Sequence, residues 1–137
     1  MAKIVLTDAK VTINSVVLSD HISSITLDTK EDIVETTGFG ATGAAKTRVA
    51  GLVDNSVTID FMQDFAAANV EATIYPLIGT ATTIVVQPTS SAVGTTNPTY
   101  TFSAIISEWQ PLKGGIGQLA TASVTWPISG AIAKATA

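Results

Sequence analysis

The stretch Asn55-Ser56-Val57-Thr58-Ile59-Asp60-Phe61-Met62 decides the fold, because apolar and polar residues alternate along it. Successive side chains of a β-strand point to opposite faces of the sheet, so Val57, Ile59 and Phe61 share one face and the polar residues share the other. This alternation predicts a strand that buries one face against a core and leaves the other face open to water.

The composition extends this prediction to the whole chain of 137 residues. Ile occurs 14 times, Val 13 times and Thr 21 times, whereas Leu occurs only 7 times. Residues branched at Cβ fit a pleated sheet better than a helix. Apolar residues make up 46% of the chain and the net charge is −4, which argues against a disordered chain. We therefore expect one mainly β domain over residues 1–137.

Other segments with strand character lie on both sides of this stretch. They cover residues 3–7, 11–18, 24–28, 33–37, 81–87, 99–109 and 118–128, with a turn at Asn14-Ser15. Residues 24–37 form part of a predicted hairpin with an acidic tip or rim. The N-terminal segment and the tail over residues 129–137 are expected to be flexible. Seven or eight short strands predict an antiparallel β-sandwich or barrel.

One helix is predicted within this β framework, from about residue 65 to 75. Asp64 is a suitable N-cap, and the apolar residues Val70, Ile74, Leu77 and Ile78 recur at helical spacing. Gly79 is expected to end the helix. The predicted fold class is therefore an antiparallel β-sandwich or barrel with one packed α-helix.

Charge and cysteine content exclude several functions. Arg48 is the only arginine among 7 basic residues, against 11 acidic ones, so the chain lacks the basic patch that nucleic-acid binding requires. The chain has no cysteine, which excludes disulfides, zinc ribbons and thiol catalysis. The apolar N-terminal run is too short for a signal peptide, and no apolar stretch is long enough to cross a bilayer. We expect a chain that is intracellular when made and does not bind membranes.

The stretch Gly38-Phe39-Gly40-Ala41-Thr42-Gly43 matches the pattern of a dinucleotide-binding loop. That pattern requires a helix immediately after it, and residues 46–51 have no helical periodicity. The same stretch fails as a phosphate-binding P-loop, because two extra residues move Lys46 out of register. A mobile glycine-rich loop is therefore the favoured interpretation, and no cofactor is predicted.

Metal binding and catalysis find little support in the remaining residues. Asp28, Lys30 and Asp32 have calcium-loop spacing, but Lys30 stands where an oxygen ligand is required, which leaves only a looser divalent-ion site as an alternative. His21 is the only histidine, and no nucleophile motif accompanies it. We predict no catalytic residue and no metal ligand.

The aromatic residues Trp109, Trp126, Tyr75 and Tyr100 are candidates for a platform that stacks on sugars. Trp126 has the same strand parity as Val124 and Ile128, which favours a place in the core. A carbohydrate-binding or adhesive β-sandwich remains an alternative function, and it requires an exposed Trp109 or Trp126. An enzyme would require a cleft that contains His21.

The order of several segments resembles the short major tail proteins, or tail tube proteins, of long-tailed bacteriophages. A hairpin with an acidic rim is followed by Thr36-Thr37-Gly38-Phe39-Gly40 and by Lys46-Thr47-Arg48-Val49-Ala50-Gly51-Leu52. The strand over residues 55–61 follows, then the segments 63–66, 74–80 and 97–98, and the end Val124-Thr125-Trp126-Pro127-Ile128-Ser129-Gly130. The resemblance covers nearly the whole chain and depends on order and spacing.

The resemblance implies a structural protein of the virion tail. Six copies would form a ring, and rings would stack into a hollow tube through which the genome passes. The tail tape measure, tail tip and tail terminator proteins would be its partners, together with transient, non-specific passage of DNA. The resemblance also implies synthesis and assembly in the cytoplasm of a bacterial host.

Two sets of residues become candidates for function in such a tube. Asp28, Glu31, Asp32 and Glu35 are expected to contribute to an acidic surface that faces the lumen or the ring, because negative side chains repel DNA weakly and let it slide. The loop over residues 36–50 is expected to order on assembly and to form contacts between copies. Its candidate contact residues are Gly38, Phe39, Gly40, Lys46 and Arg48.

Overall fold

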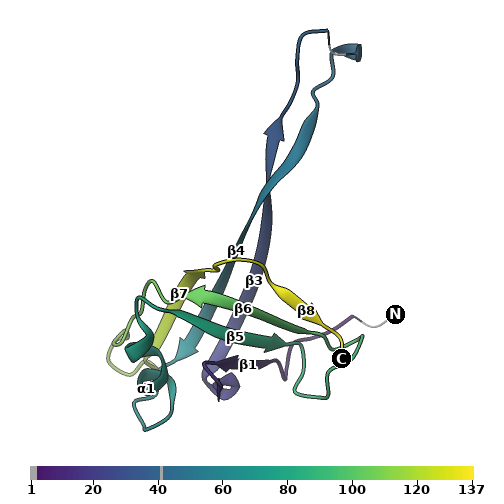
Figure 1. Ribbon diagram of the computed structural model, residues 1–137. Coiled ribbons are helices and arrows are strands. Elements are labelled where there is room, and N and C mark those ends of the chain that lie inside the picture. The colour runs from purple at the N-terminus through teal and green to yellow at the C-terminus, as the bar shows by residue number, and fades with distance from the viewer. Residues whose placement is uncertain (1–2, 41) are drawn as a thin grey trace.

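The computed structural model describes residues 3–40 and 42–137. Within these residues two antiparallel sheets form a sandwich with one short helix (Figure 1). The larger sheet has the strand order β2-β1-β5-β6-β8, and the smaller has the order β3-β4-β7. The strands are β1 (Lys10–Ile13), β2 (Val16–Val17), β3 (Ile22–Glu35), β4 (Arg48–Met62), β5 (Ala81–Gln87), β6 (Thr99–Ile105), β7 (Thr121–Pro127) and β8 (Ala133–Ala135).

Strand β4 is the centre of the smaller sheet, and its C-terminal half confirms the strand that the alternation predicted. Val57, Ile59 and Phe61 are completely buried, whereas the polar residues between them are partly exposed. Ile59 lies opposite Ile25 of β3 on one side and Val124 of β7 on the other. The core therefore forms along this strand and faces the apolar residues of β1, β5 and β6.

The turn at Asn14-Ser15 is confirmed by the backbone. Both residues have positive φ angles, 50° and 67°, and Ile13 lies directly opposite Val16 across the turn. Two consecutive residues with positive φ form the tight turn whose twist matches a two-residue hairpin, and Asn tolerates that conformation well. The turn joins β1 to β2 and thereby sets the position of the chain before β3.

Both tryptophans lie in or against the core. Trp126 is completely buried, and its indole Nε1–H donates to the carbonyl oxygen of Glu108 at 2.9 Å. Trp109 is partly buried and meets Phe61 edge-on, with ring centroids 5.3 Å apart. The prediction of a core position for Trp126 is confirmed. An exposed tryptophan platform, which a sugar-binding sandwich would require, is not formed by either residue.

The helix is shorter than predicted and begins later. Helix α1 comprises Val70–Ile74 and continues into a 3₁₀ turn over Tyr75–Leu77. Asn69 occupies the N-cap position, so the predicted start near residue 65 and the cap at Asp64 are wrong. Ala68 has a positive φ of 63°, which a continuous right-handed helix does not contain. Val70 and Ile74 are buried as the apolar spacing indicated.

Both ends of the chain differ from expectation. Residues 3–7 form no strand, although they are rich in branched apolar residues. The tail over 129–137, expected to be flexible, contains β8, which pairs with β6 through Thr99 opposite Ala135. This pairing satisfies backbone groups along the outer edge of β6. Residues 1–2 of the predicted N-terminal segment and Ala41 of the predicted loop lie outside the described residues.

The hairpin of β3 and β4 extends far beyond the sandwich as an arm (Figure 1). We call residues 29–35 and 48–54 the stem of this arm, and residues 36–47 its tip. Strand pairing continues to Glu35 opposite Arg48, so residues 48–50 belong to a strand and the loop is shorter than the predicted 36–50. Branched residues such as Ile33, Val34 and Val49 favour this extension of the strands.

The central position of Ile59 gives a direct test of the core. Ile59→Ala removes buried methyl groups from the middle strand and is expected to lower the free energy of unfolding by about 2–5 kcal/mol. Thr58→Ala, on the opposite face of the same strand, is the matched control and should have a much smaller effect. Chemical denaturation of both variants measures the difference, and equal losses would contradict the assignment of the buried face.

Candidate assembly surface

The stem of the arm exposes apolar side chains that a single copy leaves uncovered. Ile33 is 61% exposed, Leu52 81% and Val49 53%. An isolated two-stranded hairpin is marginally stable in water, and exposed apolar surface of this kind marks interaction sites. The contact residues predicted from the sequence lie in the loop over residues 36–50, and the apolar side chains Ile33 and Leu52 of the stem were not among them. The signal for the stem is the cluster of branched residues on either side of that loop.

A bulge interrupts the stem at Gly51. One residue of β3, Asp32, lies opposite two residues of β4, Gly51 and Leu52. A Cβ atom on Gly51 would lie 3.3 Å from Cγ2 of Val34, closer than side chains normally pack, and 3.4 Å from Cβ of Asp32. Glycine therefore fits this close approach, and the extra residue locally increases the twist of the ribbon.

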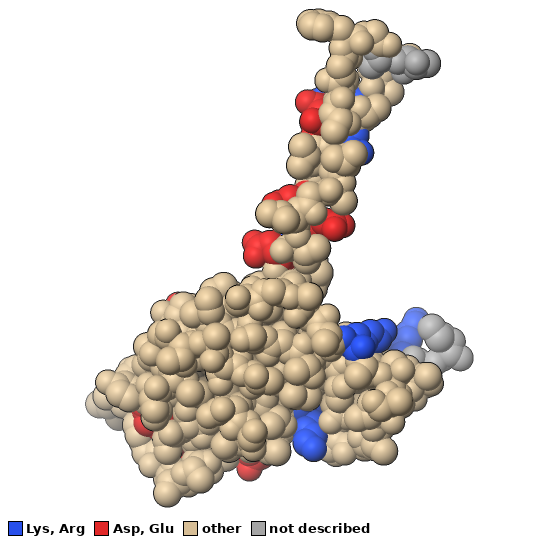
Figure 2. Space-filling view, in the orientation of Figure 1, with Lys and Arg blue, Asp and Glu red and all other residues tan. Residues whose placement is uncertain are grey.

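The four predicted acidic residues all lie on β3, but they do not share one face. Strand alternation places Asp28 and Asp32 on one face and Glu31 and Glu35 on the other. Figure 2 shows acidic groups along the arm rather than at its tip. Lys30 lies 3.5 Å from Asp28, and Lys46 lies 3.5 Å from Glu35, which partly offsets the negative charge. Their predicted role in facing a lumen or ring stays a prediction.

The tip contains the glycine-rich segment. Phe39 is fully exposed, and Gly40 has a positive φ of 80°. The loop is closed at its base, where the Thr36 and Thr47 hydroxyls lie 2.9 Å apart and the Thr47 N–H donates to the Thr37 hydroxyl at 2.8 Å. A strand follows the glycine pattern, so the helix required for dinucleotide binding is absent from this described part of the chain.

The remaining predicted contact residues lie where the tip joins the stem. Lys46 is in the tip and pairs with Glu35, and Arg48 begins β4 directly opposite Glu35. Gly38 and Gly40 flank Phe39 in sequence. The five predicted loop residues therefore form two groups. Gly38, Phe39 and Gly40 form an apolar group, and the basic residues Lys46 and Arg48 lie where the tip joins the stem.

An apolar groove of about 810 Å³ lies where the arm meets the sandwich. One wall comes from the roots of β3 and β4, and the other comes from β5, β6, the segment before β8 and the N-terminal segment. Side chains that line it include Ile4, Leu6, Leu27, Val86, Tyr100 and Ile132. This groove was not predicted from the sequence, because its walls come from segments that are distant in sequence.

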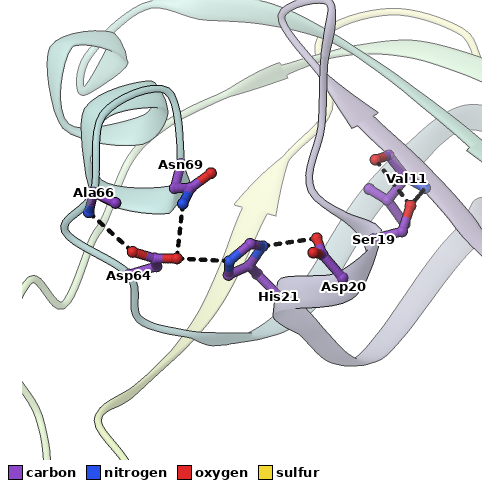
Figure 3. Close-up of polar contacts among 7 residues, drawn as sticks. All are labelled: Val11, Ser19, Asp20, His21, Asp64, Ala66 and Asn69. Carbon is purple, nitrogen blue, oxygen red and sulfur yellow. Dashed lines mark hydrogen bonds and ion pairs between the residues drawn. The ribbon is translucent and has the colours of Figure 1, made fainter.

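The imidazole of His21 is held between two carboxylates (Figure 3). Nδ1 lies 2.8 Å from an Asp20 oxygen, and Nε2 lies 2.8 Å from an Asp64 oxygen. Asp64 also accepts from the Ala66 N–H and the Asn69 amide, so it organises the turn before α1. The histidine therefore ties the start of β3 to this turn, and its partners are carboxylates rather than a nucleophilic serine.

This environment shifts the pKa values of both partners. Burial alone would lower the pKa of His21, but hydrogen bonds and charge from Asp64 and Asp20 outweigh it and raise the pKa above its usual 6.5. The pKa of Asp64 is lowered, first by the hydrogen bond from the Ala66 N–H and then by His21. Both shifts favour the ion pair over neutral groups.

The outer edge of β7 is occupied by side chains. The Thr125 N–H donates to a Glu108 carboxylate oxygen at 2.7 Å, and the Ser123 N–H donates to the Gln110 side-chain oxygen at 3.0 Å. Unpaired strand edges invite pairing with another chain. Glu108 and Gln110 therefore block strand addition at β7, a role that local sequence patterns do not indicate.

Among the described residues, no group of three or more histidine, aspartate or glutamate side chains could hold a metal ion. Over the same part of the chain, no helix has the length and apolar character needed to span a membrane. The main surface features are an uncovered apolar arm, an apolar groove and the outer edge of β7, where side chains accept hydrogen bonds from the backbone N–H groups.

The His21 pair predicts how stability depends on pH. A raised folded-state pKa means that protonated His21 contributes stability that is fully present below the unfolded pKa near 6.5 and is lost as pH rises through the folded pKa. Thermal unfolding midpoints should therefore fall as pH rises through this window. His21→Gln should remove that dependence, and an unchanged pH slope in this variant would contradict the assignment.

The guarded edge of β7 predicts a change in association. Glu108→Ala combined with Gln110→Ala frees two N–H groups and should increase irregular aggregation, measured by light scattering at constant concentration. Glu108→Gln combined with Gln110→Glu keeps an acceptor at both positions and is the matched control. Equal scattering by the two double variants would show that the side chains do not guard the edge.

Comparison with solved structures identifies the fold. A chain from the virion of a native gene transfer agent particle matches with a TM-score of 0.74 and 11% identity, covering 93% of this chain and 95% of that one. A chain from the tail of an empty gene transfer agent particle with C6 symmetry has a TM-score of 0.60 and 13% identity, covering 82% and 81%. A chain from the six-fold symmetrised baseplate of the anti-feeding prophage has a TM-score of 0.58 and 10% identity, covering 98% and 97%.

The sequence comparisons add no relative, because no protein-family model and no curated protein matches this chain. The similarity is therefore one of fold, and it extends over most of the chain in each comparison. This chain has the predicted tail-tube fold, an antiparallel β-sandwich with one short helix that it shares with chains of virion, tail and baseplate particles.

Proposed function

We propose that this chain is a structural protein of a virion tail, whose copies form hexameric rings that stack into a hollow tube for genome passage. The observation that carries the proposal is the apolar arm, which a single copy leaves uncovered on a fold shared with a C6-symmetric tail. An enzyme or a ligand-binding module does not require such an arm. A protein that assembles with copies of itself can use the arm as a contact surface.

The physical argument concerns the surfaces that one copy cannot satisfy. The arm would lose little conformational freedom on docking, because β3 and β4 already pair along its stem. Burial of its apolar side chains would then contribute about 25 cal/mol for each Å² removed from water. Arm and body are different surfaces, so their contact is heterologous, and a heterologous contact closes into a ring when the rotation between copies allows it.

The tip supplies a second contact in this proposal. Phe39, between Gly38 and Gly40, is fully exposed in the tip and would bury its ring against an adjacent copy. Lys46 and Arg48 would add charged contacts at the base of the tip. The glycines allow the tip to adjust its backbone when it meets its partner. The loop would then become fully ordered on assembly.

The acidic residues of β3 have a related role. Because Asp28 and Asp32 lie on one face of the strand and Glu31 and Glu35 on the other, one pair can face the lumen or an adjoining ring while the other pair faces a neighbouring copy. A net charge of −4 on each copy leaves the tube without affinity for the phosphate backbone. DNA would pass through without being held.

The proposed location is the virion tail, with synthesis and assembly in the cytoplasm of a bacterial host. The tube would contact a tape measure protein inside it and tail tip and tail terminator proteins at its ends. The alternative of a sugar-binding or adhesive sandwich loses its main requirement, because Trp126 is buried and Trp109 packs on Phe61. The enzyme alternative requires a cleft that contains His21, and His21 does not line the apolar groove.

Electron microscopy of the concentrated, purified protein tests this proposal. Negatively stained wild-type protein should show rings or hollow tubes with six-fold symmetry. Phe39→Ser should raise the concentration needed for assembly by about ten- to a hundredfold, since burying a phenylalanine contributes about 1.5–3 kcal/mol.

Leu112→Ser is the matched control, because Leu112 is also an exposed apolar residue but lies outside the arm. It should assemble at the wild-type concentration. A wild-type protein that stays monomeric at all concentrations, or one that assembles equally well with Phe39→Ser, would contradict the proposed tube or the role of the tip respectively.

A further inference from the structure

We propose that the stem of the arm of a second copy lies in the apolar groove at the root of this copy's arm. The inference rests on the proposed function, because it requires that copies associate, and it specifies which two surfaces meet. It commits to the stem as the occupant of the groove. The loop at the tip is a separate contact.

The groove is large, and several of the apolar side chains that line it remain exposed in a single copy. Its volume of about 810 Å³ lies between the two sheets, where facing sheets normally fill the space with side chains. Ile4 and Leu6 line it and remain more than half exposed. Asn55 also borders it, and the buried Oδ1 atom of Asn55 has no hydrogen-bond partner among the described residues. These observations indicate a site completed by another molecule.

The stem has a surface that fits such a groove. Val34 and Val49 are directly opposed across the two strands, so their side chains form a cross-strand pair on one face. Both are about half exposed. Leu52 adds a third apolar side chain at the bulge, where it is 81% exposed. A narrow apolar ridge of this kind suits a groove between sheets better than a flat surface.

The stem cannot fill the groove of its own copy. Leu27, Thr29 and Val53, at the root of the arm, form part of the groove wall. From this root the arm projects away from the sandwich (Figure 1), and pairing from Ser24 to Glu35, interrupted only by the bulge at Asp32, prevents it from folding back. A stem that fills this groove must therefore come from a second copy.

The lysines beside the groove favour an acidic occupant such as the stem over an uncharged one. Lys134 lines the groove, and Lys3 and Lys10 are adjacent in sequence to the lining residues Ile4 and Ala9. None of the three has an ion-pair partner among the described residues. Figure 2 shows basic groups on the body below the arm and acidic groups along the arm. Opposite charges on two surfaces steer them together and fix their register.

The matching acids lie beside the apolar ridge. Asp32 shares the strand face of Val34, and Asp54, directly opposite Lys30, lies next to the bulge. Within the described part of the chain neither aspartate forms an ion pair, whereas Lys30 is within 3.5 Å of Asp28. The acid near the groove, Asp8, is held by hydrogen bonds from the N–H and hydroxyl of Ser90. An acidic, apolar stem therefore complements an apolar groove flanked by lysines.

Cysteine crosslinking tests the contact, since the natural chain has no cysteine. Val49→Cys and Ala131→Cys are purified as separate variants, mixed under assembly conditions and treated with a short bismaleimide crosslinker. Ala131 is an exposed residue that lines the groove. The mixed product should exceed that of the control mixture, Val49→Cys with Leu112→Cys, by at least about tenfold, because docking raises the effective concentration of the two thiols.

A second variant tests the groove without any crosslinker. Ala131→Trp fills the groove from an exposed position. It should raise the protein concentration needed for association by tenfold or more, and a tenfold change corresponds to about 1.4 kcal/mol. Ala131→Ser is the matched control and should associate normally. Circular dichroism of the dilute variants checks that both remain folded, so that a loss of association is not a loss of structure.

The outcomes separate this inference from the proposed tube. Tubes in the microscope with no excess of the Val49–Ala131 product, or with normal association of Ala131→Trp, would overturn the groove contact and leave the proposed function intact. The crosslinked product without rings or tubes would support the groove contact and count against the tube. A monomer at all concentrations with no product would overturn both.

Discussion

The continuity of β4 is the constraint on which the rest of this structure depends. One strand from Arg48 to Met62 supplies the buried centre of the smaller sheet and then leaves the sandwich as half of the arm. Its pairing with β3 is maintained through one bulge, so the arm is an extension of the sheet. The buried residues Val57, Ile59 and Phe61 anchor the arm, and the direction in which the arm leaves is fixed by the packing of the core.

Because β4 continues into the arm, the free protein exposes an apolar two-stranded ribbon to water, which is unfavourable. The stem has no layer against it in a single copy, and a two-stranded ribbon alone gains little stability. The outer edges of β7 and β6, in contrast, are occupied by other parts of the same copy. Glu108 and Gln110 occupy the outer edge of β7, and β8 covers β6. Another chain is therefore hindered from adding to β7 and β6, whereas the arm and the groove remain available as surfaces for association.

The sequence predicted the parts of the fold that depend on local alternation and turn chemistry. The strand over residues 55–62, the turn at Asn14-Ser15 and the burial of Trp126 follow from strand parity and from residues that tolerate positive φ. The predicted start of the helix is wrong. The Asp64 carboxylate forms hydrogen bonds with the Ala66 N–H and with His21 instead of capping a helix. Strand β8 was missed, because its small residues pair with β6 only once the sandwich exists.

Only the parts of the candidate surface that depend on local sequence were predicted. Local sequence indicated the glycine-rich tip with Phe39, since glycine clusters mark loops. The predicted loop over residues 36–50 included Val49, but the apolar side chains of the stem were not predicted as contacts, because only the length of the hairpin leaves them exposed. The groove could not be predicted, because Leu6, Leu27 and Ile132 meet only through long-range pairing.

The central claim is that copies of this chain cover the arm. Hydrogen exchange of the backbone amides in dilute protein and in assembled protein tests it most directly, because exchange reports local opening of each segment. We expect amides of residues 29–35 and 48–54 to exchange much more slowly in assembled protein, while amides of residues 57–61, in the part of β4 that is paired on both sides, exchange at the same rate in both. Equal protection of the arm in both states would contradict the claim.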